Sequence, residues 1–424
     1  YNLRDSFTDG RNTFARFGLE WRGDGVSAKA ALFHASHFLD WRNSENYVWN
    51  PSTRLVQRDL FYIHRNDDLV GARLQLGWDT TLAGRRLQAS VGLDASHNDL
   101  FRGTRAPGAL PVAVFNVPLG SPDLGSTPAA FARFVPQARA TVDTVAPFVE
   151  AAWDVSDRVK LIGGLRHDRL DVDRNDLINP AASVNQNYAP TTGRFGATFA
   201  VTPGAQLYAS VATSADPVQQ FVSINTAQAA LSLQTGRQLE AGWKQSLADG
   251  RFEWTAAAYR IEKRDLLTTS IINGLSVAQA VGQQSSKGVE LAAHWRPDAR
   301  FDLGANVAYT AARYDDFAET VANPRAGQPG EPATVLVDRS GLTPPNVPRW
   351  TANLSAVYRP ADAWEIGAVA RHVGARQANN ANLIEVPGFT VLDASVAWTQ
   401  GRWRYALFGR NLGDRLYADW AINQ

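Results

Sequence analysis

GFTVLDASVAWTQGRWRYALFGRNLGDRLYADW, residues 388–420, reads as one β-hairpin with two different faces. Apolar and polar side chains alternate along both arms, as in strands that have one apolar face. The apolar positions are Leu392, Ala394, Val396 and Trp398 on the first arm and Trp403, Tyr405 and Leu407 on the second. We expect Trp398 and Trp403 to meet beside the short turn at residues 399–402, where a membrane–water interface would favour an aromatic pair. Apolar and polar residues also alternate in the sheets of soluble proteins, so the choice between a soluble sheet and a membrane barrel depends on the rest of the chain.

Length and composition favour one large architecture. The chain has 424 residues, which is long for one ordinary soluble domain, yet it contains no linker, low-complexity tract or composition shift. Its formal net charge of +1 gives no signal for a nucleic-acid or strongly acidic partner. The absence of Cys excludes disulfides and thiolate metal sites.

No stretch of the sequence approaches the roughly 18 apolar residues of a membrane helix. A membrane β-barrel remains open, because each of its strands needs only about 9–11 residues and is recognised by alternation. The sequence shows no signal peptide, begins at Tyr1 and contains no Met. We interpret it as a mature or truncated part of a longer protein.

Short turns and long connections alternate along the chain. Residues 1–10 read as the end of a loop. Strands are expected at about 12–21, 26–38, 55–78 with a bulge at 65–68, 87–93, up to 153, 158–170, 191–202, 205–214, 236–247, 251–264, 286–296, 300–313, 348–359 and 362–373, before the final hairpin. Long connections are expected at about 97–140, 171–190, 215–235, 265–285, 314–347 and 374–387. A closed up-and-down barrel with one plain and one elaborated rim has this layout.

The two faces of the expected strands support a barrel in a membrane. Aromatic residues lie on the apolar faces, mostly near the short turns, as a girdle would require. They are Trp78, Trp153, Trp243, Trp254, Trp295, Trp350, Tyr358, Trp364, Trp398 and Trp403. The opposite faces carry charge in mid-strand, for example Glu240, Lys244 and Arg404, which predicts a wide polar interior.

The sequence predicts an all-β fold, a transmembrane antiparallel up-and-down β-barrel of which about sixteen strands are present. The strand at 402–410 has no following partner in the sequence, and an open edge does not persist in lipid. We therefore expect at least one C-terminal strand and some N-terminal strands to lie outside these residues, and the fragment not to close a stable barrel alone.

Four blocks of sequence, in order, resemble those of a known family. Residues 237–244, RQLEAGWK, resemble its E-x-G-x-K strand and are followed by the Asp-Gly-Arg turn at 249–251 and an aromatic-rich strand ending near Tyr259. Residues 286–291, SKGVEL, resemble its x-x-G-x-E-x strand. Residues 345–358, PNVPRWTANLSAVY, and 411–417, NLGDRLY, resemble its x-P-x-H/W-x-x-x-L-x-x-x-Y strand and its N-L-x-D-x-x-Y signature. The chain thus resembles the C-terminal part of a TonB-dependent outer-membrane receptor of the ferric-siderophore type.

The resemblance implies a 22-stranded barrel, of which residues 1–424 would be a part, plugged by an N-terminal globular domain that contacts TonB. Neither the plug, nor its TonB motif, nor a last strand ending in an aromatic residue is found in this sequence. The implied location is the outer membrane of a Gram-negative bacterium. The implied partners are the TonB complex, reached through the missing N-terminal part, a ferric siderophore or similar small ligand, and outer-membrane lipid and lipopolysaccharide, with no nucleic acid.

Ligand capture is expected at the long-connection rim, from aromatic and basic side chains. Ferric siderophores are often anionic and flat-edged, so Arg and aromatic groups would suit them through charge-assisted hydrogen bonds and stacking. The candidates are Trp41, Tyr47, Trp49, Phe101, Arg102, Arg105, Phe221, Tyr314, Arg371 and Arg376. Alternatively, these residues fold the loops or contact lipopolysaccharide.

The residues predict no catalytic or metal site. The seven His form no compact ligand spacing with carboxylates, and His34 and His37 would point to opposite faces of one strand. Adjacent His167 and Asp168 cannot form a dyad for the same reason, so an enzyme is not expected. No resident cofactor is expected, and iron would enter only as part of the transported ligand.

Several cargoes remain open within this reading. The first hypothesis is energy-coupled import of a ferric siderophore. Cobalamin, haem, a saccharide or an aromatic compound could use the same mechanism, although the Asn-Pro-Asn-Leu motif of haem receptors is absent from the sequence. A passive porin fits less well, because the connections are long and uneven.

Overall fold

The computed structural model describes residues 3–44, 47–105, 112–118, 120, 125–126, 133–216, 222, 233–272 and 275–420. Among these residues the regular structure is almost entirely β-strand, with one 3-10 turn, η2 (Pro180–Ala182). No helix in the described part of the chain is long and apolar enough to cross a membrane.

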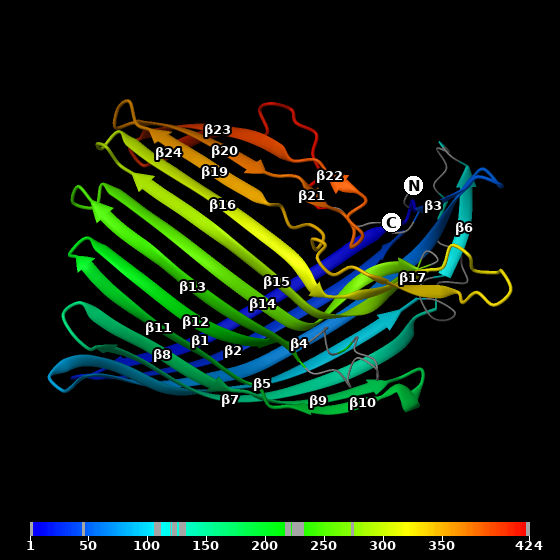
Figure 1. Cartoon of the computed structure of the whole chain (residues 1–424), viewed down its shortest axis with the longest axis horizontal. Helices are drawn as coiled ribbons and strands as arrows, with labels where there is room; N and C mark the ends of the chain where they lie inside the picture. Colours follow the sequence, from blue (N-terminus) through cyan, green and yellow to red (C-terminus); the bar gives the residue numbers. More distant parts are fainter. Residues whose placement is uncertain are drawn as a thin grey trace.

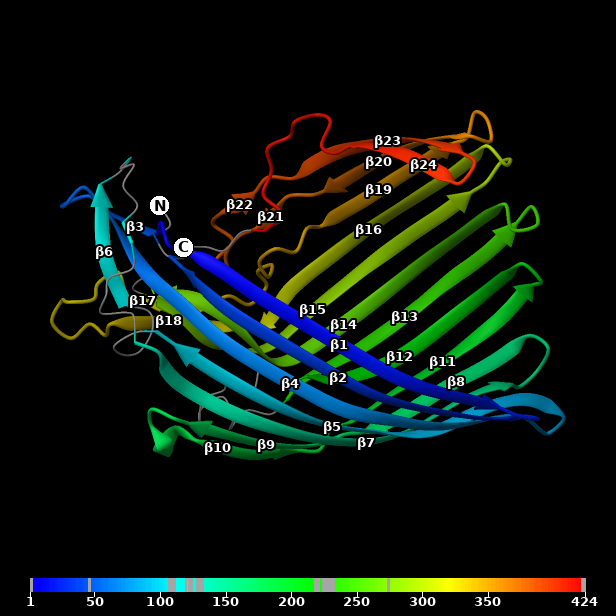
Figure 2. The same cartoon turned by 180° about the vertical axis from the view of Figure 1, so that it is seen from behind.

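Sixteen of the described strands lie side by side as one curved antiparallel wall (Figures 1 and 2). They are β1 (Phe7–Arg22), β2 (Val26–Asn43), β4 (Leu55–Leu82), β5 (Arg85–Thr104), β7 (Val135–Asp154), β8 (Val159–His167), β11 (Thr191–Thr202), β12 (Ala205–Asp216), β13 (Gln234–Leu247), β14 (Phe252–Ile272), β15 (Leu275–Trp295), β16 (Phe301–Asp316), β19 (Trp350–Tyr358), β20 (Trp364–Val373), β23 (Phe389–Gln400) and β24 (Trp403–Gly409). Each pairs with the next along the chain, so the predicted up-and-down sheet is confirmed.

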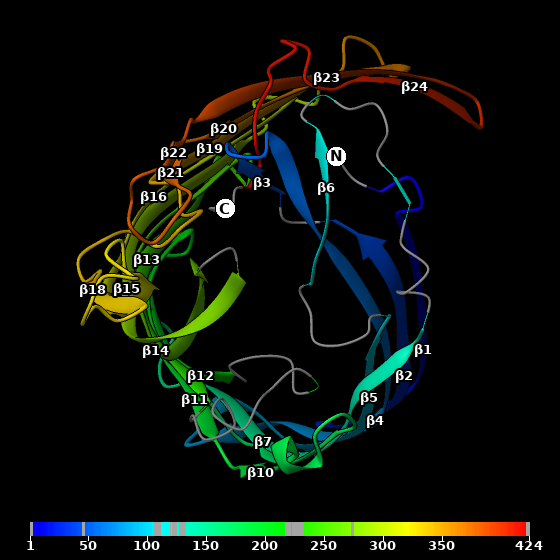
Figure 3. The ribbon, with the colours of Figure 1, turned by 90° about the vertical axis from the view of Figure 1, so that its right-hand side faces the viewer.

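The wall curls around a central space, the lumen, with β1 and β24 at its two ends (Figure 3). Within the described residues β1 pairs with β2 and β24 pairs with β23, and no pairing joins β1 to β24. The edge expected at residues 402–410 is therefore present in the described sheet.

Further short strands lie at the long-connection rim. They are β3 (Tyr47–Asn50), β6 (Val112–Pro118), β9 (Arg169–Asp176), β10 (Val184–Tyr188), and β17 (Ala318–Ala322) with β18 (Thr334–Asp338) and β21 (Arg376–Gln377) with β22 (Glu385–Val386), which form two separate two-stranded sheets. Several connections predicted as loops thus contain paired backbone. The largest correction is at residues 265–285, where β14 and β15 continue as one hairpin up to the pair Ile272 and Leu275. The ladder satisfies backbone groups that a loop would leave to water.

Other predicted boundaries were also wrong. The first strand begins at Phe7, inside the stretch expected to be a loop. The predicted strand at 158–170 is interrupted at Asp168, between β8 and β9. No bulge occurs at 65–68, where β4 pairs regularly with both neighbours; its irregularity lies at Arg58 and Asp59, opposite β6.

The outer face of the wall is apolar. Alternate residues along each strand are large, hydrophobic and exposed, as lipid-facing positions of a barrel should be. Examples are Leu32, Leu74, Leu93, Val149, Leu165, Phe195, Leu207, Leu239, Leu291, Leu354 and Leu392. The residues between them form the inner face, which carries most of the cross-strand ion pairs, including Arg194 with Glu150 at 2.7 Å and Arg404 with Glu365 at 3.1 Å.

Aromatic side chains gather on the outer face at the short-turn rim. The predicted contact between Trp398 and Trp403 was wrong in its partner: Trp398 stacks on Tyr405 at a centroid distance of 5.7 Å and lies 6.2 Å from Trp364. Trp403 lies opposite Gln400, two pairs closer to the turn. The aromatic end of the apolar band is present, but the register moves the pair by two residues.

On the inner face, glycines alternate with aromatic rings that lie across them. The ring of Tyr208 covers Gly242, and the ring of Tyr259 covers Gly288. A Cβ at Gly242 would come within 2.6 Å of both the Tyr208 ring and the Ala256 carbonyl oxygen. Glycine is therefore required at position 242, because the ring and the carbonyl oxygen approach its backbone closely. The absence of a side chain lets the ring lie along the wall.

Candidate functional site

Three arginines gather on the inner face near the long-connection rim. Arg65 of β4 and Arg102 of β5 are direct cross-strand neighbours, and Arg174 of β9 acts on the same group. Burial, together with the positive charges of Arg65 and Arg174, lowers the pKa of the Arg102 guanidinium. The three guanidinium groups are therefore close enough for their charges to act on one another.

An apolar area adjoins these arginines on the same inner face. Its buried members are Leu100, Ala138, Ala140, Val142, Val172, Tyr188, Val222 and Leu233. Arg174 links the two areas, because its Nε donates to the Val222 carbonyl at 3.3 Å and its Nη2 pairs with Asp176 at 3.0 Å. The arrangement places cationic groups beside a buried apolar cluster near the long-connection rim.

Arg371 and Arg376, both predicted candidates, meet at the rim of β20 and β23. Their guanidinium carbons lie 5.3 and 6.0 Å from the ring centroid of Phe389. Tyr417 stacks on Phe389 at 4.2 Å and accepts a hydrogen bond from Arg371 at 3.4 Å. Arg376 is only 4% exposed, and its Nη2 donates to the Ala418 carbonyl. The pair therefore holds the segment after β24 against the inner wall.

Trp41 and the two predicted residues of β3 lie at the same rim. Trp41 packs edge-on against Phe61 at 5.2 Å. Trp49 lies opposite Val56 in the β3–β4 ladder and is 45% exposed. Tyr47 begins β3, and its side chain lies outside what is described. Phe221 also lies outside the described residues.

Phe101 and Arg105 lie on the outer face, above the apolar band, and not in the lumen. Phe101 lies 5.9 Å from the His64 ring in an aromatic group. Arg105 Nε donates to the Tyr62 hydroxyl at 3.0 Å, and that hydroxyl donates to Asp40. Burial, and then the hydrogen bond to the Asp40 carboxylate, raises the pKa of Tyr62. These groups pack the strand extensions together and do not join the inner arginines.

Tyr314 is buried within a polar network that joins two rim connections. Its hydroxyl donates to Asn380 Oδ1 at 2.8 Å, and Asn380 Nδ2 donates to Glu319 at 2.8 Å. Glu319 pairs with Arg339 at 2.7 Å. With its side chain 2% exposed, Tyr314 positions the β17–β18 hairpin and is not available to a ligand in this structure.

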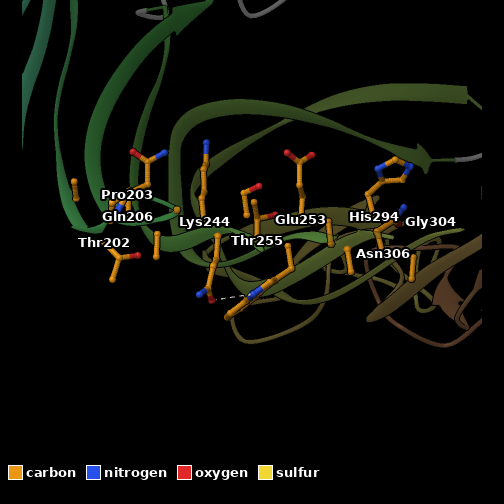
Figure 4. A pocket seen from close by; sticks show the side chains of 18 of the residues that line it. Thr202, Pro203, Gln206, Lys244, Glu253, Thr255, His294, Gly304 and Asn306 are labelled. Atoms are coloured by element: carbon orange, nitrogen blue, oxygen red, sulfur yellow. Dashed lines mark hydrogen bonds between the residues drawn. The ribbon is translucent and has the colours of Figure 1, made fainter. Parts of the chain in front are cut away.

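The short-turn half of the inner wall contains a cavity of about 700 Å³. Figure 4 shows Gln206, Lys244, Glu253 and His294 pointing to the same side of the sheet there. His294 Nε2 lies 2.6 Å from an oxygen of Asp302. The cavity offers both signs of charge as well as amide and hydroxyl groups, which suits a polar protein surface better than a small apolar molecule.

The described residues contain no group of three or more His, Asp or Glu side chains arranged to hold a metal ion. His167 and Asp168 diverge as expected: His167 Nδ1 lies 2.9 Å from the Thr191 hydroxyl, and Asp168 accepts from Arg166 at 2.9 Å.

Residues 1–412 match the protein family described as "TonB dependent receptor-like, beta-barrel". The chain belongs to the TonB-dependent receptor family. The resemblance seen in the four sequence blocks is thereby confirmed, and so is the all-β barrel class of the fold.

Relatives of this TonB-dependent receptor chain include proteins named for metal-chelate binding. It is 26% identical to the metal-pseudopaline receptor CntO of Pseudomonas aeruginosa over 377 residues, 85% of this chain and 49% of that protein. It is 24% identical to the ferrioxamine receptor of Yersinia enterocolitica over 260 residues, 59% of this chain and 33% of that protein. The crystal structure of the siderophore receptor PiuA from Acinetobacter baumannii superposes with a TM-score of 0.82 at 21% identity, covering 100% of this chain and 63% of that one. The chain thus spans about half the length, or less, of these curated relatives.

Arg65 and Arg174 were missed by the sequence analysis, although Arg102 was named. The inward position of Arg65 could have been predicted, because it lies an even number of residues before inner-face Gly71 and Arg73 along β4. Arg174 lies in a connection that was predicted to be a loop, and in a loop the residue number does not tell which way a side chain points.

Proposed function

We propose that the whole protein is an outer-membrane receptor that imports a ferric siderophore in a TonB-dependent way, and that this chain supplies its barrel. The observation that carries the proposal is the inner cluster of Arg65, Arg102 and Arg174 beside an apolar area at the elaborated rim. Membership of the family and the chelate-receptor names of several relatives support it.

The chemistry of the rim fits an iron chelate. Hydroxamate, catecholate or carboxylate oxygens around iron leave a complex with anionic edges, which guanidinium groups bind through charge-assisted hydrogen bonds. We propose that the contact with TonB, and a plug in the lumen, belong to parts of the whole protein outside these 424 residues.

The first test is uptake by a Gram-negative host that lacks its own receptors and carries the natural gene. Iron is supplied only as one ferric siderophore at a time, with haem and cobalamin run in parallel. We expect growth on at least one ferric siderophore, and loss of that growth when TonB is deleted. Growth on no iron source, with the protein folded in the outer membrane, would refute the siderophore assignment and favour a non-iron nutrient.

Substitution of an inner arginine gives a more specific test of the proposed function. Arg102→Gln should weaken binding of the active chelate by roughly tenfold or more, because one charge-assisted contact is lost. Arg105→Gln is the matched control, since it removes an arginine three residues away on the outer face. Equal affinities of both variants, measured by ligand titration of the purified protein, would show that the inner cluster does not bind the ligand.

A further inference from the structure

Two groups of charged side chains with opposite sign lie on the outer face of the wall, in different sectors of the sheet. The positive group lies on β13–β16 and occupies the same alternate positions as outward Leu239 and Val289 lower on the strands. Its members, which we call the outer basic patch, are Arg237, Arg260, Arg264, Lys287 and Arg313, all exposed.

The outer basic patch has an excess of positive charge. Arg260 pairs with Glu262 at 2.7 Å and Arg313 pairs with Asp315 at 2.8 Å. The other three members have no ion-pair partner within the part of the chain that the structure describes. These three charges are therefore open to a partner of the opposite sign.

The negative group lies on the outer face of β4, β5, β7 and β9. The cross-strand rows show that its members face outward, because Asp143 lies opposite His97, which lies opposite outward Val70. One row further from the apolar band, Asp68 lies opposite Asp99. Its members, which we call the outer acidic patch, are Asp68, Asp99, Asp143, Asp171 and Asp173.

The outer acidic patch has a matching excess of negative charge. Asp99 pairs with Arg139 at 2.7 Å and Asp171 pairs with Arg169 at 3.3 Å. Two other members contact histidines, which carry charge only when protonated. Asp173 has no ion-pair partner among the described residues. Each patch thus has five charges of one sign, of which two pair with a fixed charge of the other sign.

Both patches begin directly beyond the outward apolar band, so they lie at the same level of a membrane. On β15 and β16, the row that contains Val289 and Tyr309 is followed by the row that contains Lys287. On β7, the row that contains Val145 is followed by the row that contains Asp143. Charged groups therefore replace apolar ones within one row in both sectors, as at a membrane–water interface.

Both patches also lie on strands that are already paired on both sides. In Figure 3, β13–β16 and β4–β5 occupy different sides of the curved wall, and the free ends of the sheet are at β1 and β24. Strands that close the barrel between β1 and β24 would therefore pair with neither sector. A body inside the lumen would lie behind the wall and would not reach the outward side chains.

We propose that the outer basic patch of one copy of this protein binds the outer acidic patch of a second copy beside it in the membrane. A lipid phosphate would match only the basic patch, whereas a second copy matches both patches at one level. The proposal rests on the proposed function only in requiring that the barrel lies in a membrane.

The positions of the patches determine the kind of assembly. Because the patches lie in different sectors, the contact is heterologous, and each copy binds one neighbour through each patch. Copies then form rows and not closed pairs. Exposed ion pairs are individually weak. The membrane nevertheless confines all copies to one plane and one orientation, which raises their effective concentration.

The test is cross-linking between copies in intact outer membranes of cells that express the natural gene. The chain contains no Cys, so one cysteine can be placed at a neutral outward position within each patch, at Ser285 and at Thr141. We expect Ser285→Cys/Thr141→Cys, treated with a short bis-maleimide, to give dimers, trimers and larger species. Each single variant should give monomers. Ser285→Cys/Thr390→Cys, whose second cysteine lies outward on β23 beyond Leu392, is the control for crowding and should also give monomers.

Charge reversal tests the complementarity itself. Arg260→Glu/Lys287→Glu in the Ser285→Cys chain should lower cross-linking to a Thr141→Cys chain by roughly fivefold, since two exposed attractions become repulsions. Asp143→Lys/Asp173→Lys in the Thr141→Cys chain should have the same effect. Co-expression of the two reversed chains should restore the yield, which distinguishes lost attraction from a folding defect.

Monomers alone from Ser285→Cys/Thr141→Cys, an equal yield from the crowding control, or no restoration by the two reversed chains would overturn the proposal. So would loss of cross-linking when divalent cations are chelated but not when sodium chloride is added, because a lipid or an ion would then bridge the copies. Cross-linked rows without chelate uptake would count against the proposed function alone, and uptake without rows against this inference alone.

Discussion

Asp67 is a single residue of the inner wall whose side chain lies in surroundings less polar than water. It faces the lumen from the extension of β4, beyond the outward apolar residue Val70. Burial raises the pKa of this carboxyl, although the charges of His37 and Arg65 act in the opposite direction. Its Oδ1 is buried and has no hydrogen-bond partner within the described residues. The ionised side chain is therefore costly where it stands.

The sign of the pH effect follows from that raised pKa. Ionisation destabilises the folded state above the folded-state pKa, and this cost disappears as the pH falls below the ordinary value of about 4. We expect Asp67→Asn to raise the melting temperature at neutral pH, with a gain that vanishes under acid conditions. Circular dichroism of the detergent-solubilised protein measures it. Asp68→Asn, on the outward side beside His34, is the control for loss of a neighbouring carboxylate; an identical gain there would contradict the argument.

Sequence alone could identify the residue types of the candidate site but not their grouping. Arg102 was predicted as a ligand contact, and the structure places it between Arg65 and Arg174 on the inner face. Phe101, one residue earlier, was predicted for the same role and points outward. The choice between them depends on the alternation of faces along β5, which continues to Thr104, whereas a loop was predicted from about residue 97. The roles of all the predicted contacts remain predictions.

At the scale of elements, the pairs of glycine and aromatic ring make a precise stability prediction. Gly242→Ala places a methyl group against the Tyr208 ring and a backbone carbonyl, and should cost about 1–3 kcal/mol through overpacking. Gly18→Ala is the matched control, because this inward glycine of β1 has no neighbour nearer than 3.8 Å to a new Cβ. The readout is the temperature at which the folded band is lost in heated gel samples. A loss as large for Gly18→Ala would show that glycine matters for reasons other than ring packing.

Element boundaries were predictable at the short-turn rim and not at the other. Short turns there carry Gly, Pro and Asp, so the ends of β11 at Thr202 and of β12 at Ala205 were located to the residue. At the elaborated rim the strands continue because neighbouring strands continue, which is a tertiary effect. Residues 273–274 are Asn-Gly, a dipeptide that favours a hairpin turn, and this signal was not used when a loop was predicted at 265–285.

For the whole molecule, the two faces of the wall should respond oppositely to charge. Leu291→Lys puts an ammonium group in the middle of the outward apolar band and should cost roughly 2–4 kcal/mol in a bilayer. Glu290→Lys, the adjacent inward position, changes charge only in the lumen and should assemble normally. Membrane fractionation with a protease-protection assay compares the two. Normal assembly of Leu291→Lys would refute the assignment of the outer face.

The overall architecture was predictable because it repeats. Alternation of period two and alternation of short with long connections occur many times, so single errors cancel, and about sixteen wall strands were expected and found. The partner of Trp398 was missed because a register error of two residues leaves both faces intact.

The rings that lie over inner glycines also affect how much of the lumen the side chains fill. Because Tyr208 and Tyr259 lie flat on Gly242 and Gly288, their bulk adds little thickness to the wall. At the height of these two rings the lumen is therefore wider than it would be if the rings projected from the wall. A methyl group at one of these glycines would tilt a ring into the lumen and narrow the passage at one defined height.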